Sequence, residues 1–284
     1  SDMDSGKSYA YSKCGTVELG GTIKKRYNTK MFAKPTDAAI YAALPRVTDL
    51  TFMAQGSFKG VYKCKVDGKA EALKLIQIPS VPAGDDDAAE ARKVYEARIA
   101  REIELLGKCK TPEIVKLGSL APIPVTIETI EAVAYSEELL NGPTLWEIWR
   151  KKGPKPPEDE AKKLFLSLLT AIQEIWSFKV VHRDIKPCNV MKLADPDRQF
   201  VLLDLGIAFS RLDTALTGTG ILPPATYRYF APEMANPNFR DSLDFRSDLY
   251  TAALTVFEYT AQEHPLARDN DDLMAAEGVP PGVL

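Results

Sequence analysis

Three features of the sequence predict an α+β fold. Segments with the two-residue alternation of β-strands recur between Leu50 and Ile76 and again at 132–138. Apolar residues at helical spacing mark two long helices, at about 88–108 and 156–178. Within 180–206, a few polar residues stand between short apolar β-type runs, which is how a rigid scaffold carries reactive groups in loops. The sequence therefore predicts strands and helices that together support a functional loop.

The composition limits the class of protein. The 284 residues are enough for one large domain or two lobes with a sizeable core. A hydrophobic fraction of 45% and a charged fraction of 26% are typical of a soluble globular protein. The net charge of −3 gives no bulk attraction to nucleic acid or anionic lipid, so no nucleic-acid partner is expected. No apolar run reaches the ~20 residues of a membrane span and no signal peptide is evident, so we expect a cytoplasmic protein without a membrane segment.

The four cysteines carry little information about function. They are widely spaced and include no Cys-x-x-Cys pair. This spacing favours neither a zinc knuckle nor a disulfide framework. We therefore expect reduced thiols, as is usual in the cytoplasm.

Residues 1–48 form an extension to which the sequence assigns no chemistry. Thr36 followed by Asp-Ala-Ala-Ile-Tyr-Ala-Ala-Leu predicts a short helix capped by the threonine. Two alternatives remain open for the rest of the extension: it packs on the lobe that follows, or it is partly disordered.

Four polar residues of the central loop region have the chemistry of phosphoryl transfer. They are Asp184, Lys186, Asn189 and Asp204. A carboxylate can accept a hydroxyl proton and a lysine can neutralise a phosphoryl oxygen. An amide oxygen and a second carboxylate can bind Mg²⁺, which prefers hard oxygen ligands. Such a set suits a reaction in which catalysis is mostly positioning and charge stabilisation.

The same region resembles the catalytic loop and the metal-binding loop of protein kinases. It reads His-Arg-Asp-Ile-Lys-Pro-Cys-Asn and later Asp-Leu-Gly, with Leu205 where kinases usually have Phe. The resemblance implies that Asp184 orients and deprotonates the acceptor hydroxyl and that Lys186 steadies the γ-phosphate of ATP. It also implies that Asn189 and Asp204 hold Mg²⁺ and that Met191 contacts the nucleotide.

The β-type runs after Leu50 resemble the glycine-rich loop that covers the ATP phosphates in kinases. Ala54 replaces the first glycine of that loop, Gly56 keeps the second, and Lys59 stands where the third is expected. A hairpin with no such function gives a similar pattern, so this match is weak by itself. The nucleotide contacts that the resemblance implies here are Met53, Ala54, Gly56, Ser57 and Val61.

The segment Ala70 to Ile76 alternates as a strand does, so Ala72 and Lys74 face the same side. It resembles the Val-Ala-x-Lys strand of kinases, in which the alanine packs against adenine and the lysine reaches the α- and β-phosphates. The helix that follows carries Glu102, which the resemblance implies is the ion-pair partner of Lys74. By the same resemblance, Thr111 to Leu117 is the fourth strand.

Residues 132–145 resemble the fifth strand and the hinge between the two kinase lobes. A Gly-Pro break follows the strand, and backbone groups from Glu138 to Leu140 are expected to hydrogen-bond adenine. In this alignment Glu137 sits at the back of the adenine pocket, which is an unusual place for a carboxylate. The expected domain, 49–284, then divides into an N-lobe at 49–139 and a C-lobe at 140–284.

The segment after Gly206 resembles an activation segment that ends at Ala231-Pro-Glu. Thr226 lies where serine/threonine kinases place a threonine, and together with Lys186 it favours Ser/Thr substrates. Candidate phosphorylation sites in the segment are Thr214, Thr217 and Thr219. An unregulated loop with incidental threonines is an equally open alternative.

The stretch from Ser247 to Glu258 resembles the central helix of the large kinase lobe, in which Asp248 would accept backbone N–H groups of the catalytic loop. The resemblance then ends early, because only some twenty residues follow Pro265 where kinases usually carry several more helices. We expect either a large lobe that is shortened at its C-terminus or a chain that is part of something longer.

Together these motifs predict a two-lobed serine/threonine protein kinase that uses ATP and Mg²⁺ and acts on protein substrates. Two alternatives remain. The altered glycine-rich loop and the short C-terminus also fit a nucleotide-binding pseudokinase scaffold with weak or no activity. A small-molecule phosphotransferase of the aminoglycoside type shares part of the catalytic loop, although Lys186 and the Thr226–Glu233 stretch argue against it. The physiological substrate and the oligomeric state are not predictable from the sequence.

Overall fold

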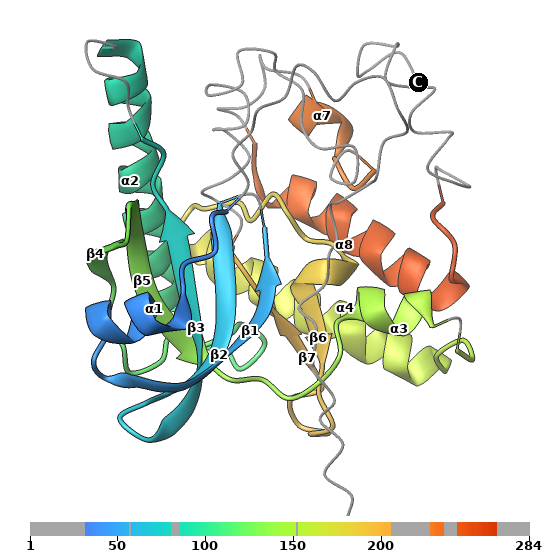
Figure 1. The fold of residues 1–284 in the computed structure, drawn as a ribbon. Helices are drawn as coiled ribbons and strands as arrows, with labels where there is room; N and C mark the ends of the chain where they lie inside the picture. Colours follow the sequence, from blue (N-terminus) through green and yellow to red (C-terminus); the bar gives the residue numbers. More distant parts are fainter. Residues whose placement is uncertain are drawn as a thin grey trace, which may run out of the picture. The chain divides into compact units, whose positions relative to one another are not determined.

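A computed structural model describes residues 32–56, 58–80, 86–151, 153–205, 228–235 and 243–265. The chain divides into two compact units. The first unit comprises Ser1–Ser80 and Leu117–Gly142, and the second comprises Val81–Lys116 and Pro143–Leu284 (Figure 1). The predicted residues Ser57, Gly206, Thr214, Thr217, Thr219 and Thr226 lie outside the described ranges. The predicted boundaries at 48/49 and 139/140 stay predictions.

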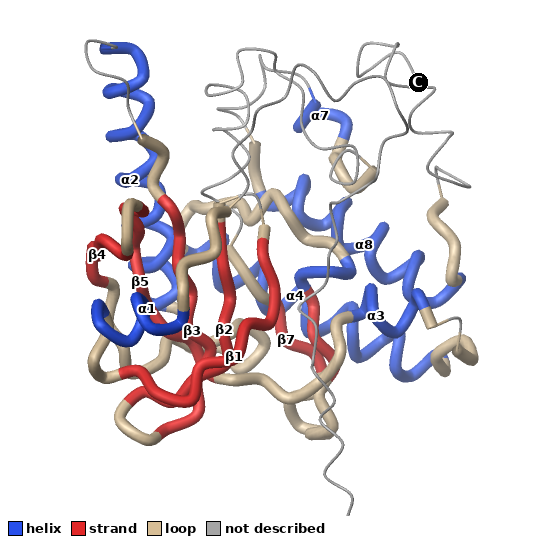
Figure 2. The backbone as a smooth tube through the Cα atoms, viewed as in Figure 1, coloured by secondary structure: helices blue, strands red, loops and turns tan. Residues whose placement is uncertain are grey.

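The first unit is built on a five-stranded antiparallel sheet with the strand order β1-β2-β3-β5-β4 (Figure 2). Two tight turns set much of this order. Asp67 and Gly68 both have positive φ, at 48° and 84°, as a two-residue hairpin between β2 and β3 requires. Glu128, at φ 58°, begins the turn between β4 and β5. The strands are β1 Val47–Gln55, β2 Lys59–Val66, β3 Lys69–Gln77, β4 Ile123–Ile127 and β5 Ile130–Glu138.

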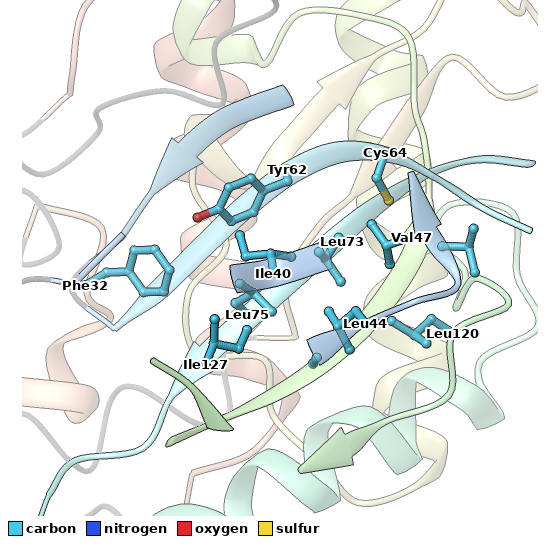
Figure 3. Close-up of a cluster of buried hydrophobic side chains, with 12 residues drawn as sticks. Phe32, Ile40, Leu44, Val47, Tyr62, Cys64, Leu73, Leu75, Leu120 and Ile127 are labelled. Carbon is cyan, nitrogen blue, oxygen red and sulfur yellow. The ribbon is translucent and has the colours of Figure 1, made fainter. Parts of the chain in front are cut away.

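One face of this sheet is covered by the end of the N-terminal extension. Helix α1, Asp37–Ala43, begins as predicted, with Thr36 Oγ1 accepting a hydrogen bond from the N–H of Ala39 at 3.3 Å. Its Ile40 packs with Phe32 and with side chains of β2 and β3 in one apolar cluster (Figure 3). Phe32 lies so close to Gly60 that a Cβ on this glycine would be 2.4 Å from the ring. Of the two alternatives for the extension, packing on the following lobe is therefore correct for residues 32–46.

The second unit is mainly helical (Figure 1). Its long helix α4 packs against α8 and against strand β7. The buried residues of α4, Leu164, Leu168, Ala171, Ile172 and Ile175, recur at helical spacing, as the sequence predicted for a core helix. The elements of this unit are α2 Asp86–Lys108, α3 Leu145–Arg150, α4 Glu158–Ser177, the 3₁₀-helix η1 Pro187–Asn189, β6 Val190–Lys192, β7 Phe200–Leu202, α7 Pro232–Ala235 and α8 Phe245–Ala261.

The predicted fourth strand at residues 111–117 is wrong. The fourth strand is Ile123–Ile127, which pairs with β5. The earlier segment belongs to the second unit up to Lys116. There the Leu202 N–H donates to Glu113 O at 2.7 Å and the Val115 N–H donates to Leu202 O at 3.1 Å. The apolar residues around Ile114 are therefore buried because they contact β7 rather than a sheet neighbour in the first unit.

The cysteines partly follow the prediction. Cys64 and Cys109 are free and buried, and burial raises the pKa of each thiol to about 11. Cys188 is in a disulfide bond, so the expectation of reduced thiols is wrong for this residue. The sequence spacing gives no signal of such a bond, because disulfide pairing depends on the folded chain.

Within the described ranges, no helix is both long enough and apolar enough to cross a membrane.

Candidate active site

The predicted catalytic loop lies between α4 and β6 in the chain, and its backbone is hydrogen-bonded to a side chain of α8. The N–H of His182 donates to Asp248 Oδ2 at 2.7 Å, and the N–H of Arg183 donates to Asp248 Oδ1 at 2.8 Å. Burial raises the pKa of the Asp248 carboxyl above its usual range, while the two N–H groups and the charge of Arg183 oppose the shift. Arg183 has φ 66°, a conformation that costs energy for a non-glycine residue. The Asp248 carboxylate accepts both hydrogen bonds, as the resemblance implied, and these bonds support the backbone in this conformation.

His182 connects the catalytic loop to the strand that leads into Asp204. Its side chain is fully buried. The ring Nδ1 accepts a hydrogen bond from the N–H of Asp184 at 3.2 Å, so the proton is on Nε2, which donates to Leu203 O at 3.4 Å. The imidazole thereby fixes the position of Asp184 relative to the residue just before Asp204.

Asp184 forms the centre of the loop. Its Oδ1 pairs with Lys186 Nζ at 2.8 Å, and its Oδ2 accepts a hydrogen bond from Asn189 Nδ2 at 2.8 Å. The Asp184 side chain keeps 25% of its surface exposed, so a substrate hydroxyl can reach the carboxylate. The fold therefore brings together three of the four polar residues that the sequence singled out. This arrangement is suited to a general base with a cation beside it.

Asn189 and Asp204 have the donor set expected of a magnesium site. Asn189 Nδ2 donates to both O and Oδ2 of Asp184, at 2.9 and 2.8 Å, which orients the amide and leaves Oδ1 as an oxygen ligand. The N–H of Leu203 donates to Asn189 O at 2.8 Å, so the backbone just before Asp204 is tied to Asn189. Asp204 itself has φ 44° and directly follows this hydrogen-bonded strand. Among the described residues, no cluster of three or more His, Cys, Asp or Glu side chains suits a metal ion.

In the first unit, four of the predicted nucleotide contacts share one face of the sheet: Ala54, Val61, Ala72 and Lys74. Ala54 lies opposite Val61, and Val61 lies opposite Lys74. Ala72 is two residues before Lys74 on β3 and therefore points to the same side. This face is opposite to the one that carries Leu73 and Leu75 in the apolar cluster with α1. The expectation that Ala72 and Lys74 face one side is confirmed.

The remaining predicted contacts are placed as follows. Met53 lies in β1 at an irregularity in the pairing with β2, and the N–H of Gly56 closes the hairpin by donating to Lys59 O at 2.8 Å. Glu138 ends β5, and Leu140 is buried just after it. Met191 is buried in β6 of the second unit.

Lys74 has a partner that the sequence did not predict. Its Nζ lies 2.5 Å from Glu137 Oε1, and each side chain is only 2% exposed. Glu102, the predicted partner, is buried on α2 in the other unit, and its pairing with Lys74 stays a prediction. The sequence places Glu137 on the predicted fifth strand but does not identify it as the partner of Lys74. The pairing register of β3 with β5 brings the two side chains together.

The comparison with protein families decides the class. The sequence profile described as "Protein kinase domain" matches residues 48–279. The chain belongs to the protein kinase domain family. This confirms the resemblance found in the motifs and the α+β kinase fold of the two units.

Several curated kinases are similar to this kinase domain. The serine/threonine-protein kinase PknD of Mycobacterium tuberculosis is 29% identical over 229 residues, which cover 80% of this chain and 31% of PknD. The probable serine/threonine-protein kinase PknB of Bifidobacterium longum is 28% identical over 75% of this chain and 29% of PknB. PknB of Mycobacterium leprae is 32% identical over 65% of this chain and 28% of that protein. This chain thus spans less than a third of the length of each of these relatives.

A solved structure supports the fold. The crystal structure of Rad53 1-466 in complex with AMP-PNP matches with a TM-score of 0.57 and 24% identity. The match covers 81% of this kinase domain and 52% of the Rad53 chain.

A second polar cluster of the kinase domain surrounds the end of the predicted activation segment. Tyr229 donates its hydroxyl to the buried carboxylate of Glu258 on α8, and Arg228 lies 3.4 Å from the same carboxylate. Burial raises the pKa of Glu258, and burial together with the Glu258 charge raises the pKa of Tyr229. Four residues later, Glu233 accepts a hydrogen bond from Ser247 Oγ at 2.6 Å. Residues 228–235 are therefore fixed on α8, the same helix that anchors the catalytic loop.

Proposed function

We propose that this kinase domain transfers the γ-phosphoryl group of ATP to Ser or Thr hydroxyls of protein substrates. The observation that carries the proposal is the contact of Asp184 with both Lys186 and Asn189 in a loop anchored by Asp248. A scaffold that only binds nucleotide has no need of a partly exposed carboxylate beside a lysine. The names of the similar curated proteins give the same activity.

The residues of the catalytic loop divide the work between them. Asp184 orients the acceptor hydroxyl and takes its proton as the bond to phosphorus forms. Lys186 neutralises charge on the γ-phosphoryl oxygens during transfer. His182 keeps Asp184 in place through its hydrogen bond to the Asp184 N–H.

The proposed cofactors are ATP and Mg²⁺. Asn189 Oδ1 and the Asp204 carboxylate are the proposed magnesium ligands, which fits the orientation of the Asn189 amide. When bound, Mg²⁺ neutralises charge on the phosphates. Lys74, with Glu102 as a predicted partner, holds the other phosphates. The proposed nucleotide contacts are Met53, Ala54, Gly56, Ser57, Val61, Ala72, Lys74, Glu138, Leu140 and Met191.

The proposed partner is a protein substrate, with no nucleic acid involved. The preference for Ser or Thr rests on Lys186, on Thr226 and on the names of the similar kinases. The cytoplasmic location predicted from the sequence stays a prediction.

A transfer assay tests the proposal. The purified chain is incubated with radiolabelled ATP, Mg²⁺ and a generic protein acceptor such as histone, and phosphoamino acids are identified after hydrolysis. We expect label on Ser or Thr, and a fall of about a hundredfold or more for Asp184→Asn, because the base is lost. Asp197→Asn is the matched control, since Asp197 is an exposed carboxylate on the turn between β6 and β7.

Two outcomes contradict the proposal. Binding of ATP without any transfer that depends on Asp184 means that the domain is a pseudokinase scaffold. Phosphate that appears on aminoglycosides or sugars but never on protein means that it is a small-molecule phosphotransferase.

A further inference from the structure

We propose that Glu137 is a positioning residue that holds Lys74 for the nucleotide phosphates. The inference rests on the proposed kinase function. It extends that function by assigning Lys74 a carboxylate partner within its own sheet. The predicted partner Glu102 belongs instead to helix α2 in the other unit.

The contact between the two side chains is close and shielded from water. Lys74 Nζ lies 2.5 Å from Glu137 Oε1, and the two side chains are each 2% exposed. The ring of Tyr135, the direct cross-strand neighbour of Lys74, lies beside the ammonium at 5.9 Å from Nζ to the centroid. A buried ammonium next to a carboxylate and an aromatic ring has little freedom to move.

The register of the sheet fixes this geometry. Strand β3 pairs with β5 so that Lys74 faces Tyr135 and Ala72 faces Glu137. Lys74 and Glu137 are thus diagonal neighbours on one face, a separation that long side chains bridge. Because β3 and β5 belong to the same sheet, the pair forms within the first unit.

The position of Glu137 places it among the proposed nucleotide contacts. It is the direct neighbour of Ala72, on the face that also carries Ala54 and Val61. An ammonium has three hydrogen-bond donors, so it can hold a carboxylate and phosphate oxygens at the same time. Glu137 therefore sets where the ammonium stands when the phosphates arrive.

The burial of the Lys74 ammonium explains why a carboxylate is suited to position 137. A lysine buried in a sheet without a counter-charge is costly, and breaking a buried pair by removing one partner is strongly destabilising. An apolar residue in place of Glu137 leaves the Lys74 ammonium without this carboxylate. The carboxylate thus holds the Lys74 ammonium in one orientation.

The test compares two ligands that differ only in their phosphates. Dissociation constants of adenosine and of Mg-ADP are measured by calorimetry for the wild type, Glu137→Gln and Glu102→Gln. We expect Glu137→Gln to raise the dissociation constant of Mg-ADP about tenfold or more. The dissociation constant of adenosine should change less than about twofold, since only the phosphates contact Lys74. Glu102→Gln is expected to weaken Mg-ADP less than Glu137→Gln does. Glu131→Gln is the matched control, because Glu131 is exposed on the same strand, and neither constant should change.

Two results overturn the inference. Equal weakening of adenosine and Mg-ADP by Glu137→Gln shows that Glu137 only supports the fold. A larger effect of Glu102→Gln than of Glu137→Gln on Mg-ADP shows that α2 positions the lysine.

Glu137→Asp keeps the inference testable if Glu137→Gln does not fold. This variant retains the charge but shortens the side chain by one methylene group. We expect it to weaken Mg-ADP several-fold with adenosine unchanged, and to lie between the wild type and Glu137→Gln. Unchanged Mg-ADP binding in Glu137→Asp overturns the inference.

The binding readout separates this inference from the proposed function. A wild type that binds Mg-ADP but transfers no phosphate contradicts the kinase function, and the two variants still decide the role of Glu137. An active wild type whose Mg-ADP binding does not respond to Glu137→Gln contradicts only the role of Glu137. A wild type that binds no nucleotide overturns both.

Discussion

The carboxylate of Asp248 accepts a hydrogen bond from the N–H of His182, at the start of the catalytic loop, at 2.7 Å. The same carboxylate also accepts from the N–H of Arg183, so one side chain on α8 satisfies two consecutive backbone donors. Arg183 is at φ 66°, an uncommon conformation for a non-glycine residue that persists only where the surrounding structure supports it. The conformation of the catalytic loop is thus set by a helix that contributes no reacting group.

Asp248→Asn tests this support. An amide has only one acceptor oxygen, so one buried N–H loses its partner, and we expect a loss of about 2 kcal/mol in the free energy of unfolding. Transfer activity should fall about tenfold or more, because Asp184 follows Arg183 directly. Urea denaturation and the transfer assay measure the two effects. Full activity and full stability of the variant would show that the loop holds its conformation by other contacts.

The catalytic loop was predictable because its residues are close in the sequence. Asp184, Lys186 and Asn189 lie within six positions, and their mutual contacts require only a short loop followed by η1. Lys74 and Glu137 are 63 residues apart, and nothing local in either strand determines the register that brings them together. The position of Glu137 on the fifth strand was therefore predictable from the sequence, but its partner was not.

Other errors of prediction have identifiable physical causes. Helix α3 was not predicted, although Thr144 and Glu147 form a capping box that is visible as Thr-x-x-Glu in the sequence. The Gly-Pro break just before it was assigned to the hinge alone. The fourth strand was placed too early because the apolar residues near Ile114 have strand character, whereas burial against β7 accounts for them. Both errors arise where an apolar or breaker signal fits more than one element.

Glu71→Gln tests a buried carboxylate of β3 on the face of the sheet that also carries Leu73 and Leu75. Glu71 is fully buried and accepts hydrogen bonds from Ser119 N–H at 2.9 Å and from Ser136 Oγ at 2.5 Å. Burial alone raises the pKa of Glu71, but these hydrogen bonds and Lys69 together lower it below its ordinary value of 4.5. We expect the variant to lose about 2 kcal/mol of unfolding free energy at pH 7, because charged hydrogen bonds are lost.

The stability difference between the wild type and Glu71→Gln should depend on pH. A carboxyl whose pKa is lower in the folded state stabilises the fold above its unfolded pKa, and the contribution is lost as pH falls through the folded pKa. The stability difference between the wild type and Glu71→Gln should therefore be largest above pH 4.5 and should narrow below it. Denaturation curves between pH 7 and pH 3 measure the difference, with Glu131→Gln as the control. A difference that stays constant over this range contradicts the role of the Glu71 charge.

Ile40→Ala tests whether the extension is part of the folded first unit. Ile40 is fully buried in the cluster that joins α1 to β2 and β3. Truncation leaves a cavity, so we expect a loss of about 3 kcal/mol in unfolding free energy. The control is Ala42→Ser, because Ala42 is exposed on the same helix. If Ile40→Ala unfolds at the same urea concentration as the wild type, α1 does not contribute to the stability of the sheet.

Asn189→Ala tests the proposed magnesium site. The substitution removes Oδ1, which is the proposed Mg²⁺ ligand. It also removes Nδ2, which donates hydrogen bonds to Asp184 O and Oδ2. We expect the Mg²⁺ concentration for half-maximal transfer to rise about tenfold or more, because the ion loses one of its proposed protein ligands. Activity at saturating Mg²⁺ should recover in part, since Asp184 keeps its ion pair with Lys186. Transfer measured against Mg²⁺ concentration separates the two effects. A lower maximal rate with an unchanged half-maximal Mg²⁺ concentration means that Asn189 only orients Asp184. The magnesium site must then be assigned to other groups.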